Sequence, residues 1–400
     1  MGLNDTAASE RIHISFFGLR NAGKSSIVNA VTGQELSVVS DIKGTTTDPV
    51  RKTMELLPLG PVVIIDTPGL DDVGALGEKR IQKAKQMLAQ TDIAVLVVDA
   101  DAGMSEQDRA IVKIFQEKKL PYLIVLNKAD LLKERRTISD ESLYASALTG
   151  EGIEALKERL GIFAKVKKNP KHIVSDLLMP NDHIVLVVPI DESAPKGRLI
   201  LPQQQTIRDI LDAHCTLSVC QPEELARVLD SMKSPPKLVI TDSQAFSQVA
   251  AVVPESILLT SFSILFARYK GNLKNFVEAS ARLSSLKNGD RILISEGCTH
   301  HRQCNDIGTV KLPGWIERFT GVRPEYSFTS GGDFPEQLSE YALIIHCGGC
   351  MLNEAEMKYR IEKAVSVGVP ITNYGIAIAH MHGILRRSLS PFPELQTLLG

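Results

Sequence analysis

The sequence predicts an α/β protein of several domains, and two observations lead to this fold class. Short apolar runs alternate with amphipathic helical stretches over residues 11–160, a pattern typical of a parallel sheet with helices on both faces. The chain is 400 residues long, which is more than one ordinary hydrophobic core contains. We therefore expect a doubly wound, mostly parallel N-terminal sheet, then a small α/β domain and a C-terminal α/β domain.

The composition excludes several classes of protein. Hydrophobic residues make up 44% and charged residues 23%, as in ordinary globular proteins, and the net charge of −2 indicates neither nucleic acid nor membrane as a partner. The chain has no apolar run of about eighteen residues and no secretory start, so we expect it in the cytoplasm. Paired cysteines in that compartment favour a metal or redox site over disulfides. The six cysteines are Cys215, Cys220, Cys298, Cys304, Cys347 and Cys350.

A phosphate-binding motif follows the first predicted strand, residues 11–17. Residues 18–25 match G-x-x-x-x-G-K-[ST] and lead into a helical stretch, which is the context that this motif requires. Its glycines allow close approach of the backbone to phosphates, and the helix N-terminus adds positive potential. We expect Lys24 to contact the β- and γ-phosphates and the Ser25 hydroxyl to bind Mg²⁺.

Two further signals concern Mg²⁺ and the γ-phosphate. The threonine-rich segment 44–48 contains Thr46 and suits a loop that closes over the metal. The apolar strand 62–65 ends in Asp66, which we expect in the Mg²⁺ shell, and the Gly69 N–H follows as a sensor of the γ-phosphate.

Two later signals predict recognition of guanine. The strand 123–126 leads to Asn127, Lys128 and Asp130, and a carboxylate there accepts two hydrogen bonds that guanine offers and adenine does not. Residues 146–148 follow a short strand and are expected to contact the guanine oxygen through backbone N–H groups.

Together these segments resemble the G1 to G5 motifs of translation-factor-like GTPases, in the branch that includes Era and MnmE, over residues 11–160. The resemblance implies that Thr46 is the Mg²⁺-binding threonine, whereas Thr47 stands where that branch usually has arginine. The predicted nucleotide-site residues are Gly18, Asn21, Ala22, Gly23, Lys24, Ser25, Ser26, Thr46, Asp66, Gly69, Asn127, Lys128, Asp130, Ser146, Ala147 and Leu148.

The same resemblance suggests how GTP is hydrolysed. Leu70 occupies the position where Ras-type enzymes have a water-orienting glutamine, and an aliphatic group cannot orient water. Asn21 stands where the MnmE-like branch uses asparagine to bind K⁺, whose charge would stabilise the leaving oxygens, and Arg20 competes for that role. We expect slow, K⁺-stimulated hydrolysis, with Lys24, Asn21 and Thr46 as the catalytic residues.

A basic stretch, residues 165–171, predicts a solvated linker after this domain. Beyond it we expect strands at 183–189, 237–241 and 256–260 and helices at 206–215 and 223–232. These strands belong to a core or to an edge that pairs with another copy. Cys215 and Cys220 lie among apolar neighbours and are interpreted as small buried residues.

A second chemical site is predicted where two later strands end. The strand 291–297 delivers Cys298 and His300, and the strand 341–345 delivers His346, Cys347 and Cys350 before a helix at 353–367. The carboxyl ends of parallel strands meet at one edge, so we expect three thiolates to converge there. Zinc with a histidine as fourth ligand, a redox dithiol and an iron–sulfur cluster all remain open, and zinc and iron–sulfur are equally supported by the residues alone.

The C-T-H segment at 298–300 and the H-C-G-G-C segment at 346–350 resemble the signature of the HydF family, the GTPase maturation factors of FeFe hydrogenases. The resemblance implies a GTP-binding domain (1–168), a dimerisation domain (169–262) and a cluster-binding domain (263–400). It implies a 4Fe-4S cluster on Cys298, Cys347 and Cys350.

The resemblance also implies partners for this cluster scaffold. It would receive a diiron precursor from radical-SAM maturases and pass it to apo-hydrogenase, acting as a homodimer without nucleic acid or membrane partners. His300 and His346 are candidates for the fourth cluster ligand, and Glu296, Cys304 and Asp306 lie near enough to substitute. The alternative is a tRNA-modification or ribosome-assembly GTPase with a structural zinc site.

Overall fold

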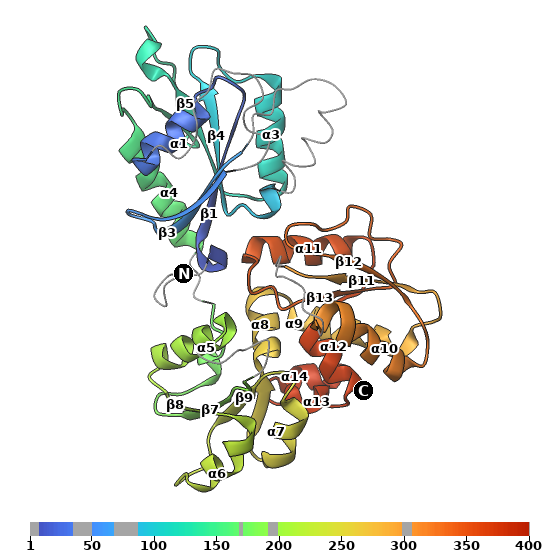
Figure 1. Cartoon of the computed structure of the whole chain (residues 1–400). Helices are drawn as coiled ribbons and strands as arrows, with labels where there is room; N and C mark the ends of the chain where they lie inside the picture. The colour runs from blue at the N-terminus through green and yellow to red at the C-terminus, as the bar shows by residue number, and fades with distance from the viewer. Residues whose placement is uncertain are drawn as a thin grey trace. The chain divides into compact units, whose positions relative to one another are not determined.

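The structure, a computed structural model, describes residues 8–34, 50–67, 87–167, 171–190, 199–297 and 306–399. The chain divides into two compact units, Met1–Pro170 and Lys171–Gly400, each with its own sheets and apolar cores (Figure 1). None of the helices in these ranges combines the length and the hydrophobicity that a bilayer-spanning segment needs.

The first unit contains a six-stranded sheet in the order β2-β3-β1-β4-β5-β6, which is parallel except for the edge strand β2. Its strands are β1 (Ile12–Gly18), β2 (Val50–Leu56), β3 (Gly60–Asp66), β4 (Ile93–Asp99), β5 (Tyr122–Asn127) and β6 (Ser142–Tyr144). Helices α1 (Lys24–Thr32) and α4 (Ile153–Lys167) pack on one face, and α3 (Glu106–Glu117) packs on the other.

The sequence of β1 shows why both faces are covered. Successive side chains of a strand point to opposite faces, so Ile14 and Phe16 enter the core under α1 and α4. Phe17 enters the core under α3, where its ring lies 5.4 Å from that of Phe115. The predicted doubly wound, mostly parallel sheet is confirmed.

The second unit contains two four-stranded, wholly parallel sheets, β10-β9-β7-β8 and β12-β11-β13-β14. In chain order both have the arrangement second-first-third-fourth, so the strand order reverses between the first and third strands of each. The first sheet comprises β7 (His183–Val187), β8 (Thr216–Cys220), β9 (Leu238–Thr241) and β10 (Leu258–Ser261). The second comprises β11 (Arg291–Ser295), β12 (Glu325–Thr329), β13 (Leu343–His346) and β14 (Ile371–Asn373).

Several element bounds differ from the sequence predictions. Helix α5 (Leu201–Asp212) begins five residues before the predicted start, because Pro202 suits a first turn and Gln203 accepts a hydrogen bond from the Ile200 N–H at 3.0 Å. The helix predicted at 223–232 is a 3₁₀ turn, η4 (Pro222–Glu224), followed by α6 (Leu225–Asp230). The domain boundary expected at residue 262 stays a prediction.

Helices α8 (Phe262–Lys270) and α12 (Tyr374–Met381) pack against each other between the two sheets of the second unit. Gly375 allows their close approach, because a Cβ there would lie 2.1 Å from the Ser263 Cβ. Side chains from both sheets join α8 in one apolar core, which includes Ile184 and Ile344. The remaining helices are α7 (Phe246–Val252), α9 (Leu273–Ser280), α10 (Leu312–Thr320), α11 (Glu354–Ser366), α13 (Leu385–Ser388) and α14 (Pro393–Gln396).

Gly375→Ala should destabilise the second unit by about 1–3 kcal/mol, because the added methyl group overpacks the crossing of α8 and α12. Gly314→Ala is the matched control, since its Cβ meets nothing closer than 4.0 Å in α10 and should add up to about 1 kcal/mol of helix propensity. The single tryptophan, Trp315, lies in α10, and its fluorescence reports unfolding of the second unit in a denaturant titration. Equal midpoints for Gly375→Ala and the wild type would refute the tight crossing.

Candidate nucleotide site and cysteine centre

The phosphate loop, residues 18–25, joins β1 to α1. Asn21 and Gly23 have left-handed backbone conformations, with φ of 63° and 82°, and Asn21 is exposed. A Cβ at Gly23 would lie 2.1 Å from Asn127 Nδ2, so only glycine fits there. Helix α1 begins at Lys24, directly after this tightly folded loop. The backbone N–H groups of a first helical turn lack partners within the helix, and such a helix start is a common binding site for anions.

Parallel pairing of β1 with β3 brings the predicted Mg²⁺ ligands together. Phe16 is in register with Asp66, so Asp66 ends its strand beside the start of the phosphate loop. Asp66 is buried, forms an ion pair with Lys24 and accepts a 3.0 Å hydrogen bond from Ser25 Oγ. A hydroxyl and a carboxylate are the oxygen ligands that Mg²⁺ prefers, so this donor set fits the metal. Thr46 and Gly69, the other predicted contacts, lie outside the described residues, as does Leu70.

Asn127 links three of the predicted nucleotide segments. It ends β5 and is buried, its Nδ2 donates to Ala22 O at 2.9 Å, and its Oδ1 accepts from the Ala147 N–H at 3.1 Å. Ser146 is buried beside it, whereas the Leu148 side chain is 86% exposed. The phosphate loop and the base-recognition segments are therefore fixed to each other by one side chain.

Lys128 and Asp130 lie on the turn that follows Asn127. Lys128 has a φ of 64°, and its Nζ forms a 2.6 Å ion pair with Asp99, which ends β4. Burial alone would raise the pKa of Asp99, but the hydrogen bond from Lys128 and two backbone N–H groups lower it overall. Asp130 is exposed, so its carboxylate is accessible to a ligand.

The cysteine centre lies where the strand order of the second sheet reverses. Ser295 of β11 is in register with His346 of β13, and the Cys347 N–H donates to Ser295 O at 2.9 Å. Ligand sites in open parallel sheets occur at this edge, outside the carboxyl ends of the strands. Cys298, His300 and Cys304 lie outside the described residues, but Gly297 immediately precedes Cys298.

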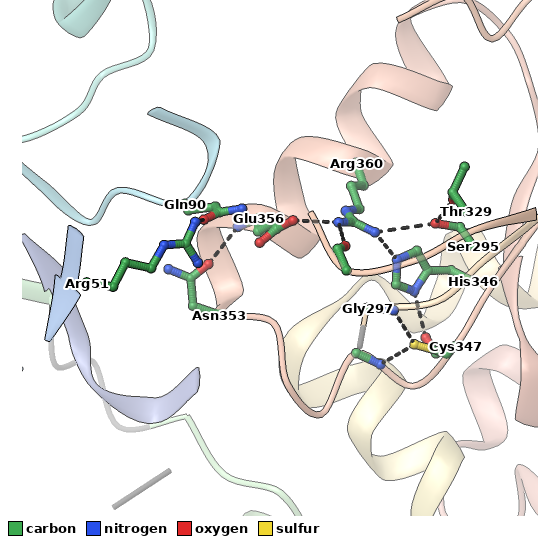
Figure 2. Close-up of polar contacts among 12 residues, drawn as sticks. Arg51, Gln90, Ser295, Gly297, Thr329, His346, Cys347, Asn353, Glu356 and Arg360 are labelled. Atoms are coloured by element: carbon green, nitrogen blue, oxygen red, sulfur yellow. Dashed lines mark hydrogen bonds and ion pairs between the residues drawn. The ribbon is translucent and has the colours of Figure 1, made fainter. Parts of the chain in front are cut away.

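Backbone N–H groups surround the sulfur of Cys347 (Figure 2). Its Sγ accepts hydrogen bonds from Gly297 N at 3.0 Å and from Gly349 N at 3.4 Å. Gly349 has a φ of 64°, and a Cβ there would lie 2.8 Å from Met357 Sδ. Such N–H donors favour a thiolate and are the usual partners of cluster-bound sulfur. The donor set thus fits a thiolate-bound metal centre.

The C-x-x-C turn, residues 347–350, is followed by Leu352, which touches the segment that leads to Cys298. A Cβ at Gly297 would lie 2.6 Å from Leu352 Cγ, so the two chain segments pack directly together. Cys350 is half-buried, and burial raises the pKa of its thiol, an effect that the nearby Lys270 ammonium opposes. Within the described ranges no three His, Cys, Asp or Glu side chains gather closely enough to hold a metal ion.

His346 is fully buried, and both of its ring nitrogens have partners (Figure 2). Arg360 Nη1 lies 3.0 Å from Nε2 and can only donate, so Nε2 accepts and Nδ1 donates to Cys347 O at 2.7 Å. Burial, and then the Arg360 charge, lowers the pKa of His346 to about 3. Ligation through Nε2 would require His346 to give up its hydrogen bond with Arg360, whereas the Nδ1–H bond to Cys347 O could remain.

Arg360 was missed by the sequence analysis and is the centre of this network. It is 1% exposed, and its guanidinium donates to Glu356 at 2.5 Å, to Gly331 O at 2.6 Å and to Ser295 Oγ at 3.3 Å. The available signal was the Glu356–Arg360 spacing of four residues on the apolar side of α11.

The other candidate residues already have partners. Tyr374 Oη donates to Glu296 at 3.2 Å, and burial, followed by the Glu296 charge, raises the pKa of the tyrosine. Asp306 caps the helical turn at 307–311 by accepting from Thr309 N at 2.8 Å. Cys215 and Cys220 are buried in apolar clusters, as predicted.

Three family models match successive parts of the chain. Residues 13–128 match a model described as 50S ribosome-binding GTPase. Residues 173–271 match the hydrogen maturase F dimerization domain, and residues 274–391 match the hydrogen maturase F tetramerization domain. The last two together span more than half of the chain.

Curated relatives match the first unit. The tRNA modification GTPase MnmE of Nitrosomonas europaea is 37% identical over 156 residues, which are 38% of this chain and 34% of that protein. GTPase Der of Kosmotoga olearia is 33% identical over 175 residues, 39% of each chain. The matched part is thus between a third and two fifths of the length of these relatives.

Among solved structures, Aquifex aeolicus Era bound to GDP.AlF4− is similar with a TM-score of 0.34 and 18% identity, over 52% of this chain and 93% of that chain. The family models and the curated relatives are the stronger evidence. They give an N-terminal GTPase domain followed by two domains of one family, and the chain therefore belongs to the hydrogen maturase F family.

Proposed function

We propose that this chain is an FeFe-hydrogenase maturation factor, a GTP-hydrolysing scaffold and carrier with a 4Fe-4S cluster on Cys298, Cys347 and Cys350. It would accept a diiron precursor from radical-SAM maturases and deliver it to apo-hydrogenase. One observation carries the proposal. The carboxyl ends of β11 and β13 lie side by side, and Cys347 Sγ accepts a hydrogen bond from the N–H of Gly297, the residue before Cys298.

For the nucleotide we propose the residues that the sequence motifs indicate. Ser25 and Asp66, with Thr46, would hold Mg²⁺, and Lys24 would exchange its ion pair with Asp66 for the β- and γ-phosphates. Mg²⁺ supplies positive charge against the phosphate oxygens. Asp130 would accept the guanine N–H groups, and the exposed Leu148 would lie over the base.

For the fourth cluster position we propose an exchangeable ligand rather than His346. The ring of His346 is fully buried and already bonded to Arg360 and to Cys347 O. His300 remains the histidine candidate. A weak fourth ligand suits a carrier, because the diiron cargo must attach there and leave again.

We propose that the chain acts as a homodimer through the sheet at residues 169–262. The strand β8 forms an edge of that sheet, and its Val219 is 47% exposed. Unpaired strand edges of this kind pair readily with a second copy. The alternative of a tRNA-modification or ribosome-assembly GTPase rests on the first unit alone, since the matches that suggest it cover about two fifths of the chain.

Asn127→Ala should weaken GTP binding by at least about tenfold. It leaves the buried Ala22 O without its partner, at about 1–3 kcal/mol, and also removes the partner of the partly buried Ala147 N–H. Titration with a fluorescent GTP analogue measures the affinity. Gln116→Ala, which removes an exposed 3.1 Å hydrogen bond to Tyr122 in the same unit, is the control and should bind as the wild type does. If the Asn127 variant binds GTP as tightly as the wild type, the two hydrogen bonds of Asn127 are not needed to hold the site together.

GTP turnover should be several-fold faster in KCl than in NaCl at equal ionic strength. We attribute the difference to K⁺ bound by the exposed, left-handed Asn21 in the phosphate loop. In a phosphate-release assay, Asn21→Ala should remove the difference, whereas Arg20→Ala should retain it. Equal turnover of the wild type in both salts would rule out the K⁺ mechanism.

Anaerobic reconstitution with iron and sulfide should give a 4Fe-4S EPR signal after reduction with dithionite. Alanine at Cys298, Cys347 or Cys350 should abolish it, because each substitution removes a thiolate ligand. Alanine at the buried Cys215 or Cys220 serves as the matched control and should preserve it. If the chain instead binds about one zinc ion and gives no iron–sulfur EPR signal, the proposed cluster scaffold is wrong and the cysteines form a structural zinc site.

A further inference from the structure

Lys270 places a buried ammonium group against the C-x-x-C turn. It is the last residue of α8 and is only 4% exposed. Its Nζ donates to Cys350 O at 3.3 Å and to Leu352 O at 3.2 Å, so it contacts the backbone on both sides of Met351. A lysine side chain is almost never this deeply buried unless a specific arrangement of partners compensates it.

The backbone around Lys270 fixes where its side chain starts. Phe262, Leu265 and Phe266 anchor α8 in the core that both sheets share. Gly271 then turns the chain sharply into α9, and a Cβ there would lie 2.7 Å from the Phe276 ring and 2.8 Å from Ala267 O. The lysine therefore lies at a rigid helix end within the dimerization-domain match, residues 173–271. It contacts backbone within the tetramerization-domain match, residues 274–391.

The charges near this turn favour a role for the lysine at the thiolates. Glu354 and Glu356, at the start of the helix that follows the turn, are already paired with Lys171 at 2.7 Å and with Arg360 at 2.5 Å. Three thiolates around a cluster make the site anionic, and a cation in a buried position acts on such charge with little screening.

We propose that Lys270 is a positioning residue of the cysteine centre. It holds the end of the C-x-x-C turn through the carbonyl groups of Cys350 and of Leu352, two residues further on, and raises the reduction potential of the cluster. This inference rests on the proposed 4Fe-4S site. One-electron reduction adds negative charge to the cluster, and a nearby buried cation stabilises the reduced form relative to the oxidised one. Lys270 thereby connects the first sheet of the second unit to the chemistry at the edge of the other sheet.

The test is an EPR-monitored potentiometric titration of the reconstituted full chain, with dithionite as reductant. Lys270→Gln keeps a hydrogen-bond donor but removes the charge, so its midpoint potential should fall below that of the wild type. Lys270→Arg keeps the charge and should remain close to the wild type. Lys274→Met is the matched control, because it removes an exposed lysine that is paired with Glu278 in the adjacent helix α9.

The outcomes separate this inference from the proposed function. A lower potential for Lys270→Gln alone, or loss of the cluster in Lys270→Gln with retention in Lys270→Arg, supports the role of the charge. Equal potentials for Lys270→Gln and the wild type overturn it and leave the cluster site intact. A wild-type chain that forms no 4Fe-4S cluster overturns the proposed function instead. Circular dichroism of each variant confirms that the chain compared is folded.

Discussion

Parallel pairing of non-consecutive strands is the constraint on which both sites depend. In a parallel sheet the carboxyl ends of neighbouring strands lie at one edge, so residues far apart in the sequence meet there. The pairing of β1 with β3 brings Asp66 to Lys24 and Ser25. The pairing of β11 with β13 brings the Cys347 N–H to Ser295 O and its sulfur to Gly297. A change of register by one residue would exchange the faces of each strand and separate these groups.

The buried Arg360 network shows how the second edge is kept in one conformation. A guanidinium in the protein interior is costly unless hydrogen bonds and a counter-charge are supplied locally. Here Glu356, Gly331 O and Ser295 supply them to the two Nη groups of Arg360, whereas its Nε has no hydrogen-bond partner among the described residues. The same group donates to His346 and so determines which ring nitrogen carries the proton. Because Nδ1 then donates to Cys347 O, the peptide that begins the C-x-x-C turn is oriented by α11.

The parts of the molecule that local sequence predicts best are those with a motif or a strong period. The doubly wound sheet follows from apolar strands and glycine turns, and Asp66 and Asn127 follow from their positions at strand ends. The edge strand β2 has largely exposed, polar residues and no apolar run, so it gives no such signal. The i,i+4 spacing predicts the pair of Arg360 with Glu356, but not its contact with Ser295, 65 residues away, and no local pattern predicts the contact of Lys270 with Cys350, 80 residues away.

The two sheets of the second unit share one strand order, yet they differ in what their edges offer. At the first sheet the strands that flank the reversal, β7 and β9, end in Val187 and Thr241, which supply no thiol. At the second sheet the equivalent strands lead to Gly297 and His346, each followed directly by a cysteine in the sequence. The fold therefore provides two similar edges, and the residues placed on them decide which becomes a site. Because α8 packs in the core common to both sheets, its last residue, Lys270, extends from the side of the first sheet to the carbonyl group of Cys350 at the edge of the second.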